Sequence, residues 1–174
     1  FIIDVQDSFI IERNKYILSN IKKIIKNIDY DLIVYSVQYN DKNSLWYKQI
    51  GWSELCSDTD TIPEIRDVLK DRENILKIKK LTRSIWKWDK DLNNILKEKN
   101  IEEIHFAWYE TNDCIMASAF ESFDLWFYTF VIEEAVETRT TASNHTKAIE
   151  ILNYLNLTNN SEFVGSREVE YYNL

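Results

Sequence analysis

The chain has 174 residues, of which 45% are hydrophobic and 29% are charged, and its formal net charge is −8. A chain of this length and composition typically forms one globular domain, so we expect a single domain over residues 1–174. The negative charge argues against a nucleic-acid partner, and no charge-free apolar run approaches the roughly 18 residues that a membrane-spanning helix needs.

Strands and helices alternate from the start of the chain. The apolar run at residues 1–4 predicts a strand, and isoleucines near helical spacing predict a helix over residues 11–27. The β-branched run at residues 31–38 predicts a fully buried strand, which need not alternate in a parallel sheet. Residues 39–63 are polar and aromatic, and they indicate a long functional loop.

The same alternation continues to the end of the chain. Further strands are expected at residues 74–79, 104–108, 125–132 and 162–164, and further helices at residues 89–99, 114–123 and 144–155. Repeated strand-helix-strand units predict a three-layer α/β/α sandwich with a mainly parallel, Rossmann-like, six-stranded sheet. Ligands of such sheets bind at the carboxyl ends of the strands.

Cys114 follows the fourth predicted strand, at the point where a helix is expected to begin. Unpaired backbone N–H groups and the helix dipole favour a thiolate there and can hold an oxyanion. Asp4 ends the first strand and Lys80 follows the third, so a parallel sheet brings both to the edge where Cys114 lies. An aspartate base, a cysteine nucleophile and a lysine cation predict amide cleavage through a thioester.

Each of these residues also has an ordinary structural interpretation when it is taken alone. An isolated cysteine is more often a buried helix residue than a nucleophile. Asp4 is equally consistent with a turn cap, and Lys80 with one more solvated lysine in a lysine-rich run. Their combination at three strand ends favours the catalytic interpretation.

Three motifs resemble those of the isochorismatase-like cysteine hydrolases, a family that includes nicotinamidases, N-carbamoylsarcosine amidases and ureidoacrylate amidases. Residues 4–9 (DVQDSF) match the pattern Asp-x-Gln-x-x-Phe. Residues 80–86 (KLTRSIW) are similar to Lys-x-x-x-Ser-x-Phe, and residues 108–115 (WYETNDCI) to Gly-Val-x-Thr-Asp-x-Cys-Val. The motifs follow the family's order, and the resemblance covers essentially the whole chain.

The resemblance implies a role for each motif. It makes Asp4 the general base, Lys80 the catalytic lysine and Cys114 the nucleophile. It also implies a cis peptide after the second residue of the third motif, with the backbone N–H groups of Glu110 and Cys114 forming the oxyanion hole. The residues expected to line the substrate pocket are Phe9, Trp86 and Tyr109, although most of the aromatics in this region are equally consistent with core or lid residues.

The predicted function is hydrolysis of an amide or ureido C–N bond of a small molecule through a thioester. Trp108 stands where the family has glycine, and Glu110 where it has a small residue. One alternative is therefore a catalytically degenerate family member that binds a small molecule or a protein. A third interpretation is an isochorismate hydrolase, although that group lacks the nucleophilic cysteine retained here as Cys114.

No cofactor is expected. Nicotinamidases hold a metal with an Asp-x-His pair after the second strand and another histidine, whereas this chain has Gln38, Tyr39 and Asn40 there. The two histidines, His105 and His145, lack the spacing of a metal chelate. We therefore predict no metal.

The two cysteines, Cys56 and Cys114, do not form a disulfide framework, and no signal-peptide pattern is present at Phe1. These features favour the reducing cytoplasm. Because Phe1 already lies in an apolar run, we expect further residues to precede it. The resemblance implies a homodimer or a homotetramer.

Overall fold

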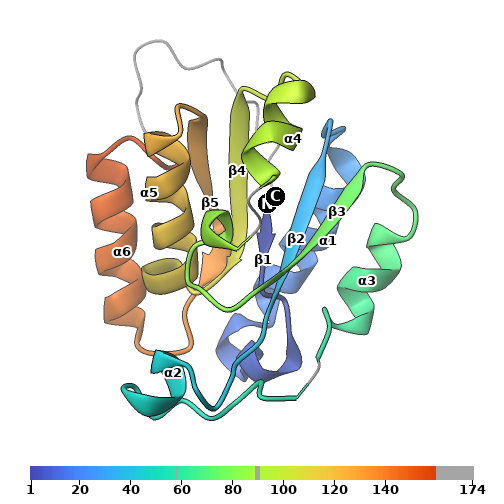
Figure 1. The fold of residues 1–174 in the computed structure, drawn as a ribbon. Coiled ribbons are helices and arrows are strands. Elements are labelled where there is room, and N and C mark those ends of the chain that lie inside the picture. Colours follow the sequence, from blue (N-terminus) through green and yellow to red (C-terminus); the bar gives the residue numbers. More distant parts are fainter. Residues whose placement is uncertain (58, 89–90, 160–174) are drawn as a thin grey trace.

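The computed structural model describes residues 1–57, 59–88 and 91–159. Its centre is a parallel sheet with the strand order β3-β2-β1-β4-β5 (Figure 1). The strands are β1 (Ile2–Ile3), β2 (Ile33–Gln38), β3 (Ile75–Lys80), β4 (Glu103–Tyr109) and β5 (Tyr128–Glu137). The strand order reverses direction at β1, and ligands of open α/β sheets bind at such a point.

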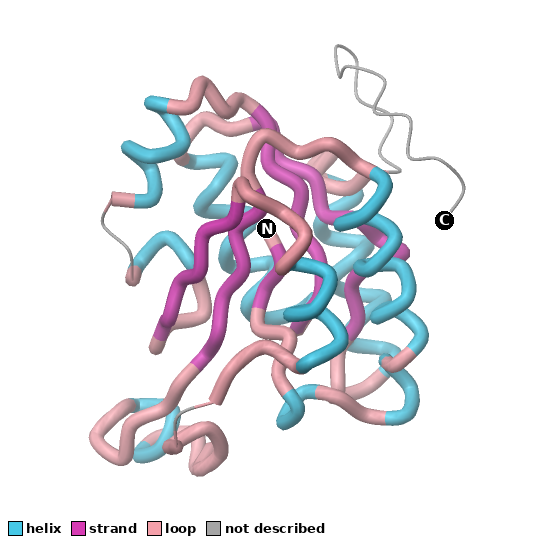
Figure 2. The backbone as a smooth tube through the Cα atoms, turned by 90° about the vertical axis from the view of Figure 1, so that its right-hand side faces the viewer, coloured by secondary structure: helices cyan, strands magenta, loops and turns pink. Residues whose placement is uncertain are grey.

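Helices cover both faces of this sheet (Figure 2). The helices of the described residues are α1 (Tyr16–Asn27), α2 (Leu45–Lys48), α3 (Pro63–Leu69), α4 (Leu92–Glu98), α5 (Met116–Asp124) and α6 (Ala142–Tyr154), of which α2 lies beyond the end of the sheet (Figure 1). Short 3-10 turns occupy Asp7–Phe9, Glu12–Asn14 and Ile85–Lys87, and a π-helical turn occupies Thr111–Ile115. None of the helices in the described part of the chain is long and apolar enough to cross a bilayer.

Two hydrophobic cores confirm the predicted three layers. Ile2 packs in the core beneath α1 and α3, whereas its neighbour Ile3 packs in the core beneath α4, α5 and α6. Successive side chains of a strand point to opposite faces, so the two-residue β1 contributes to both cores. This explains why the buried central strands are apolar without alternation.

The isoleucines of α1 show why its sequence forms a helix. Ile17, Ile21, Ile24 and Ile25 are all buried against the sheet. Their spacing places them on one face of a helix with 3.6 residues per turn, and each fully buried side chain contributes about 1.5–3 kcal/mol. The predicted helix over residues 11–27 is confirmed from residue 16, after a short 3-10 turn.

One expectation about the elements needs correction, and a second lies outside the described residues. Helix α3 begins inside the end of the region expected to be a loop; Pro63 occupies its first turn, and Ile65 and Leu69 are buried one turn apart. The described residues contain five strands instead of six, because the sixth, expected at residues 162–164, lies outside them. Beside the free edge of β5, Val131 and Thr158 form an isolated parallel bridge.

Candidate active site

Asp4, Lys80 and Cys114 meet at the carboxyl edge of the sheet. The Lys80 Nζ atom lies 2.6 Å from Asp4 Oδ2 and 3.6 Å from Cys114 Sγ. Asp4 and Lys80 are 1% and 0% exposed, and Cys114 is 8% exposed. The structure therefore brings together the three residues that the sequence indicated as catalytic.

Neighbouring strands fix the orientation of the ion pair. Ser36 Oγ donates a hydrogen bond of 2.7 Å to Asp4 Oδ1. Lys80 Nζ donates to Gln38 Oε1 at 2.7 Å and to the Thr82 carbonyl at 3.0 Å, so its three N–H donors have protein acceptors. Sequence reasoning missed Ser36 and Gln38, although both lie on β2, next to β1 and β3.

Burial and charge set the protonation states of the site. Burial raises the pKa of the Cys114 thiol, the Lys80 ammonium lowers it in part, and the carboxylates of Asp4 and Asp113 raise it further. Burial alone lowers the pKa of Lys80, but the charge of Asp4 and its hydrogen bond to Lys80 raise it, and the net shift is upward. At neutral pH the resting site thus holds an ammonium beside a protonated thiol, and catalysis needs a base.

The turn that carries Cys114 has the backbone that the resemblance implies. The peptide bond between Tyr109 and Glu110 is cis. Cys114 then lies in the π-helical turn, where the N–H groups of Asp113 and Ile115 donate to the Glu110 carbonyl at 3.0 and 3.1 Å. Glu110 and Cys114, the residues predicted to supply the oxyanion hole, both line the same pocket.

Trp108 has a glycine-like backbone, with φ at +93°. The register between β4 and β5 shifts between Phe106 and Trp108. Trp108 consequently packs in the same core as its neighbours Ala107 and Tyr109 and is fully buried. Its side chain is not among those that line the pocket beside Cys114.

The pocket above the thiol has a volume of about 400 Å³. Its aromatic wall includes Phe9 and Tyr109, as predicted, and also Trp46 and Trp52. The Phe9 ring lies 6.1 Å from Trp52 and 5.4 Å from Tyr109, centroid to centroid. The charged lining residues are Asp4, Arg83, Glu110, Asp113 and Arg139.

Trp86 does not line this pocket, and the expectation that it does so is corrected. Its ring stacks on Phe127 with the centroids 5.5 Å apart, and its indole N–H donates to the Ser118 carbonyl at 3.0 Å. Trp86 thus belongs to the core beneath α4, α5 and α6. The motif spacing located the residue but did not reveal which way its side chain points.

The carboxylate of Glu110, which lines the pocket, is paired with the guanidinium of Arg139. Arg139 Nε lies 3.1 Å from Glu110 Oε1, and Thr138 Oγ1 donates to Glu110 Oε2 at 2.8 Å. Arg139 Nη1 also donates to Glu54 Oε2 at 3.0 Å. Burial still raises the pKa of Glu110. The sequence showed the acidic residue but gave no sign of its partner 29 residues further along.

The side chains at the position of the nicotinamidase metal do not fit a metal ion. Gln38 Oε1 is held by Lys80, and Gln38 Nε2 donates to the Tyr39 carbonyl at 3.0 Å. Asn40 Nδ2 donates to the Trp52 carbonyl, and Asn40 Oδ1 accepts from Ser44 Oγ, both at 2.7 Å. No group of three or more His, Cys, Asp or Glu in the described residues could hold a metal.

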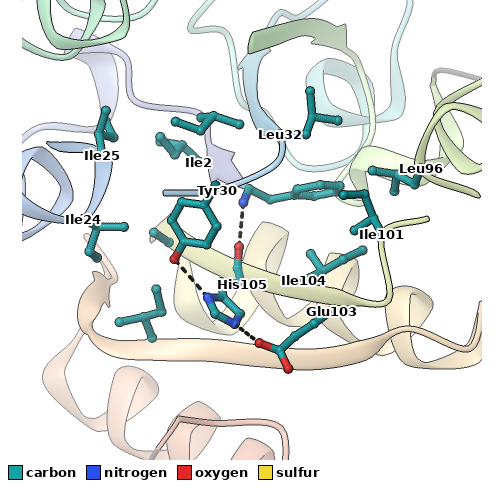
Figure 3. A pocket seen from close by; sticks show the side chains of 14 residues that line it. Ile2, Ile24, Ile25, Tyr30, Leu32, Leu96, Ile101, Glu103, Ile104 and His105 are labelled. Atoms are coloured by element: carbon teal, nitrogen blue, oxygen red, sulfur yellow. Dashed lines mark hydrogen bonds and ion pairs between the residues drawn. The ribbon is translucent and has the colours of Figure 1, made fainter. Parts of the chain in front are cut away.

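A smaller pocket, of about 50 Å³, lies where β2 and β4 begin (Figure 3). Its lining is mainly apolar, but three of its polar side chains form a hydrogen-bonded row. Tyr30 Oη lies 2.9 Å from His105 Nδ1, and His105 Nε2 lies 2.6 Å from Glu103 Oε1. None of the residues predicted for the site lines it. The candidate active site is therefore the larger pocket.

Solved structures with this fold include several hydrolases. The chain is similar to an isochorismatase-like hydrolase from Alkaliphilus metalliredigens (TM-score 0.73, 19% identity, 90% of each chain covered). It is also similar to a pyrazinamidase/nicotinamidase from Streptococcus mutans (0.73, 20%, 90% of this chain and 97% of that one). A third is an N-carbamoylsarcosine amidase from Thermoplasma acidophilum (0.71, 16%, 86% and 89%).

At these identities the structural likeness concerns the fold alone. Among curated proteins, no sequence matches the chain. The model of the isochorismatase domain, however, matches residues 1–161, which is nearly the whole chain. This match confirms the resemblance carried by the three motifs: the chain belongs to the isochorismatase family.

Proposed function

We propose that this protein is a metal-independent cysteine hydrolase that cleaves an amide or ureido C–N bond of a small molecule. One observation carries the proposal: Lys80 Nζ contacts both the Asp4 carboxylate, at 2.6 Å, and the Cys114 sulfur, at 3.6 Å. A base, a cation and a nucleophile thus adjoin one pocket. The amidases among the structurally similar proteins support the same bond type.

The first half of the reaction forms a thioester. Asp4 removes the proton of the Cys114 thiol, and the sulfur attacks the carbonyl carbon of the substrate. Lys80 stabilises the negative charge on Asp4 and on the sulfur, and the backbone N–H groups of Glu110 and Cys114 hold the oxyanion. When the C–N bond breaks, the amine leaves with the proton from Asp4.

The second half hydrolyses that thioester. Asp4, again a carboxylate, takes a proton from water, and the hydroxide attacks the acyl carbon. The C–S bond breaks, the acid is released, and the sulfur regains a proton from Asp4. Each catalytic group returns to its resting state, so the cycle needs no cofactor.

Ammonia release from a panel of amides and ureido acids tests this function. The parent should turn over at least one compound, and Cys114→Ala should lower kcat by a factor of about 10³ or more. Cys56→Ala is the matched control, because Cys56 is an exposed free cysteine, and it should leave turnover unchanged. Turnover that survives in Cys114→Ala would contradict a cysteine nucleophile. Binding without turnover in the parent would indicate a degenerate family member.

We also infer a cytoplasmic location, since both cysteines are free thiols. The homodimer or homotetramer implied by the family remains a prediction, which the mass of the particle in solution tests.

A further inference from the structure

The charges around Cys114 are compensated to different degrees. Asp4 and Lys80 form one pair, and Arg139 has two carboxylate partners, Glu110 and Glu54. Arg83 also lines the pocket, but its one ion pair in the described structure joins its Nε atom to Asp113 Oδ1. Of the two arginines that line the pocket, Arg83 therefore has fewer carboxylate partners than Arg139.

The guanidinium of Arg83 is held in place from two sides. Its carbon atom lies 4.2 Å from the centroid of the Trp46 ring, and the indole N–H of Trp46 donates to the Leu81 carbonyl at 3.0 Å. Asp113, next to the nucleophile in sequence, holds the Nε edge. A planar cation fixed in this way has little conformational freedom left to lose when it binds a ligand.

The remaining edge of Arg83 is available to a ligand. An arginine has five N–H donors, and within the described residues Nη1 and Nη2 of Arg83 make no hydrogen bond. The Arg83 side chain is 49% exposed, and Arg83 is one of the residues that line the pocket. Two parallel N–H groups match the two oxygens of a carboxylate, whereas a neutral amide offers a single acceptor.

We propose that Arg83 is a specificity-determining residue that binds a carboxylate of the substrate, so the preferred substrates are small amides or ureido compounds that carry an acid group. This inference rests on the proposed function, which sets the scissile carbonyl at Cys114. Asp113 has a positioning role, because it orients the guanidinium that faces the ligand.

Alkylation of Cys114 by a charged and a neutral reagent of nearly equal size tests this preference. Iodoacetate carries a carboxylate, and iodoacetamide a neutral amide. With either reagent the Cys114 sulfur bonds to the methylene carbon, iodide leaves with the electron pair of the C–I bond, and Asp4 accepts the thiol proton. Peptide mass spectrometry measures both rates at Cys114 and, in the same sample, at Cys56.

The readout is the ratio of the iodoacetate rate to the iodoacetamide rate. Arg83→Met should lower this ratio at Cys114 by about tenfold and leave the ratio at Cys56 unchanged. Arg66→Met, which removes an exposed arginine of α3 outside the pocket, should leave both ratios unchanged.

The possible failures are distinguishable. If Cys114 reacts with both reagents but Arg83→Met leaves the ratio unchanged, the Arg83 inference is wrong and the cysteine hydrolase remains. If neither reagent alkylates Cys114 while both alkylate the exposed Cys56, the proposed function fails, and the Arg83 inference fails with it.

Discussion

At the scale of single residues, the buried ammonium of Lys80 determines how every variant of the site must be interpreted. Taking an ammonium out of water costs several kcal/mol unless partners replace its solvation. Here Asp4, Gln38 and Thr82 replace it. Removing Asp4 alone leaves an uncompensated charge, which costs about 3–5 kcal/mol of stability. A charge-balanced double variant therefore has to accompany Asp4→Asn.

Loss of the Asp4 carboxylate should slow alkylation of the thiol. Asp4→Asn and the double variant Asp4→Asn/Lys80→Met should both lower the rate of iodoacetamide labelling at Cys114 by about 10² or more, because general-base assistance is lost. The rate at the exposed Cys56 is the internal reference for the reactivity of the reagent in the same sample. Asp7→Asn, an exposed aspartate nearby, is the control. Unchanged labelling of Cys114 in both variants would exclude Asp4 as the base.

The raised pKa of Cys114 predicts a loss of stability in alkali. The folded thiol stays protonated above the ordinary pKa of 9.0, whereas the unfolded thiol ionises. This contribution is fully present below pH 9 and is lost progressively as the pH rises towards the folded pKa, by about 1 kcal/mol at pH 10. Urea unfolding at pH 8 and pH 10 should therefore show a smaller loss in Cys114→Ala than in the parent. An identical loss in both would contradict a raised pKa, and Cys56→Ala should behave as the parent does.

At the scale of elements, the backbone at the end of β4 has an unusual conformation, and the turn that carries Cys114 follows it. Trp108 adopts a φ of +93°, where a side chain costs about 1–3 kcal/mol and glycine is favoured. The family's glycine at this position is consistent with that conformation. In this chain the fully buried indole accompanies the strained backbone, and the turn that carries Cys114 follows directly.

At Trp108 the glycine variant should be more stable than the alanine variant, which is the reverse of the usual order. Both variants lose the buried indole, but Trp108→Gly should be more stable than Trp108→Ala by about 1–2 kcal/mol, because glycine tolerates this φ. At Phe106, in ordinary strand backbone, the alanine variant should instead be the more stable by about 0.5–1 kcal/mol. Urea unfolding measures all four. The same order at both positions would contradict the left-handed backbone.

Sequence patterns predicted the elements better than the side-chain directions. Asp4, Lys80 and Cys114 could be identified because strand ends of a parallel sheet converge, whichever way each side chain points. Trp86 could not, because a position after a strand does not tell which core its ring enters. Helix α3, with seven residues, is too short for its period to stand out after a polar stretch.

At the scale of the whole molecule, alternation of strands and helices sufficed to predict one parallel sheet between two helical layers. Pairings between distant segments were beyond that reasoning, since no periodic pattern reports them. Arg139 with Glu54 and Arg83 with Trp46 join residues 46–54 to the loops that follow β5 and β3. These contacts shape the site as much as the three motifs do, and they exist only in the folded chain.

The central claim is that the substrate passes through a thioester on Cys114, and trapping that intermediate tests it most directly. Acid quenching during turnover of an amide identified by ammonia release, followed by peptide mass spectrometry, should show the acyl group on the peptide that carries Cys114. The adduct should be absent from Cys114→Ala, which should also be inactive. Turnover that continues in Cys114→Ala, with no acylated peptide in the parent, would contradict the account.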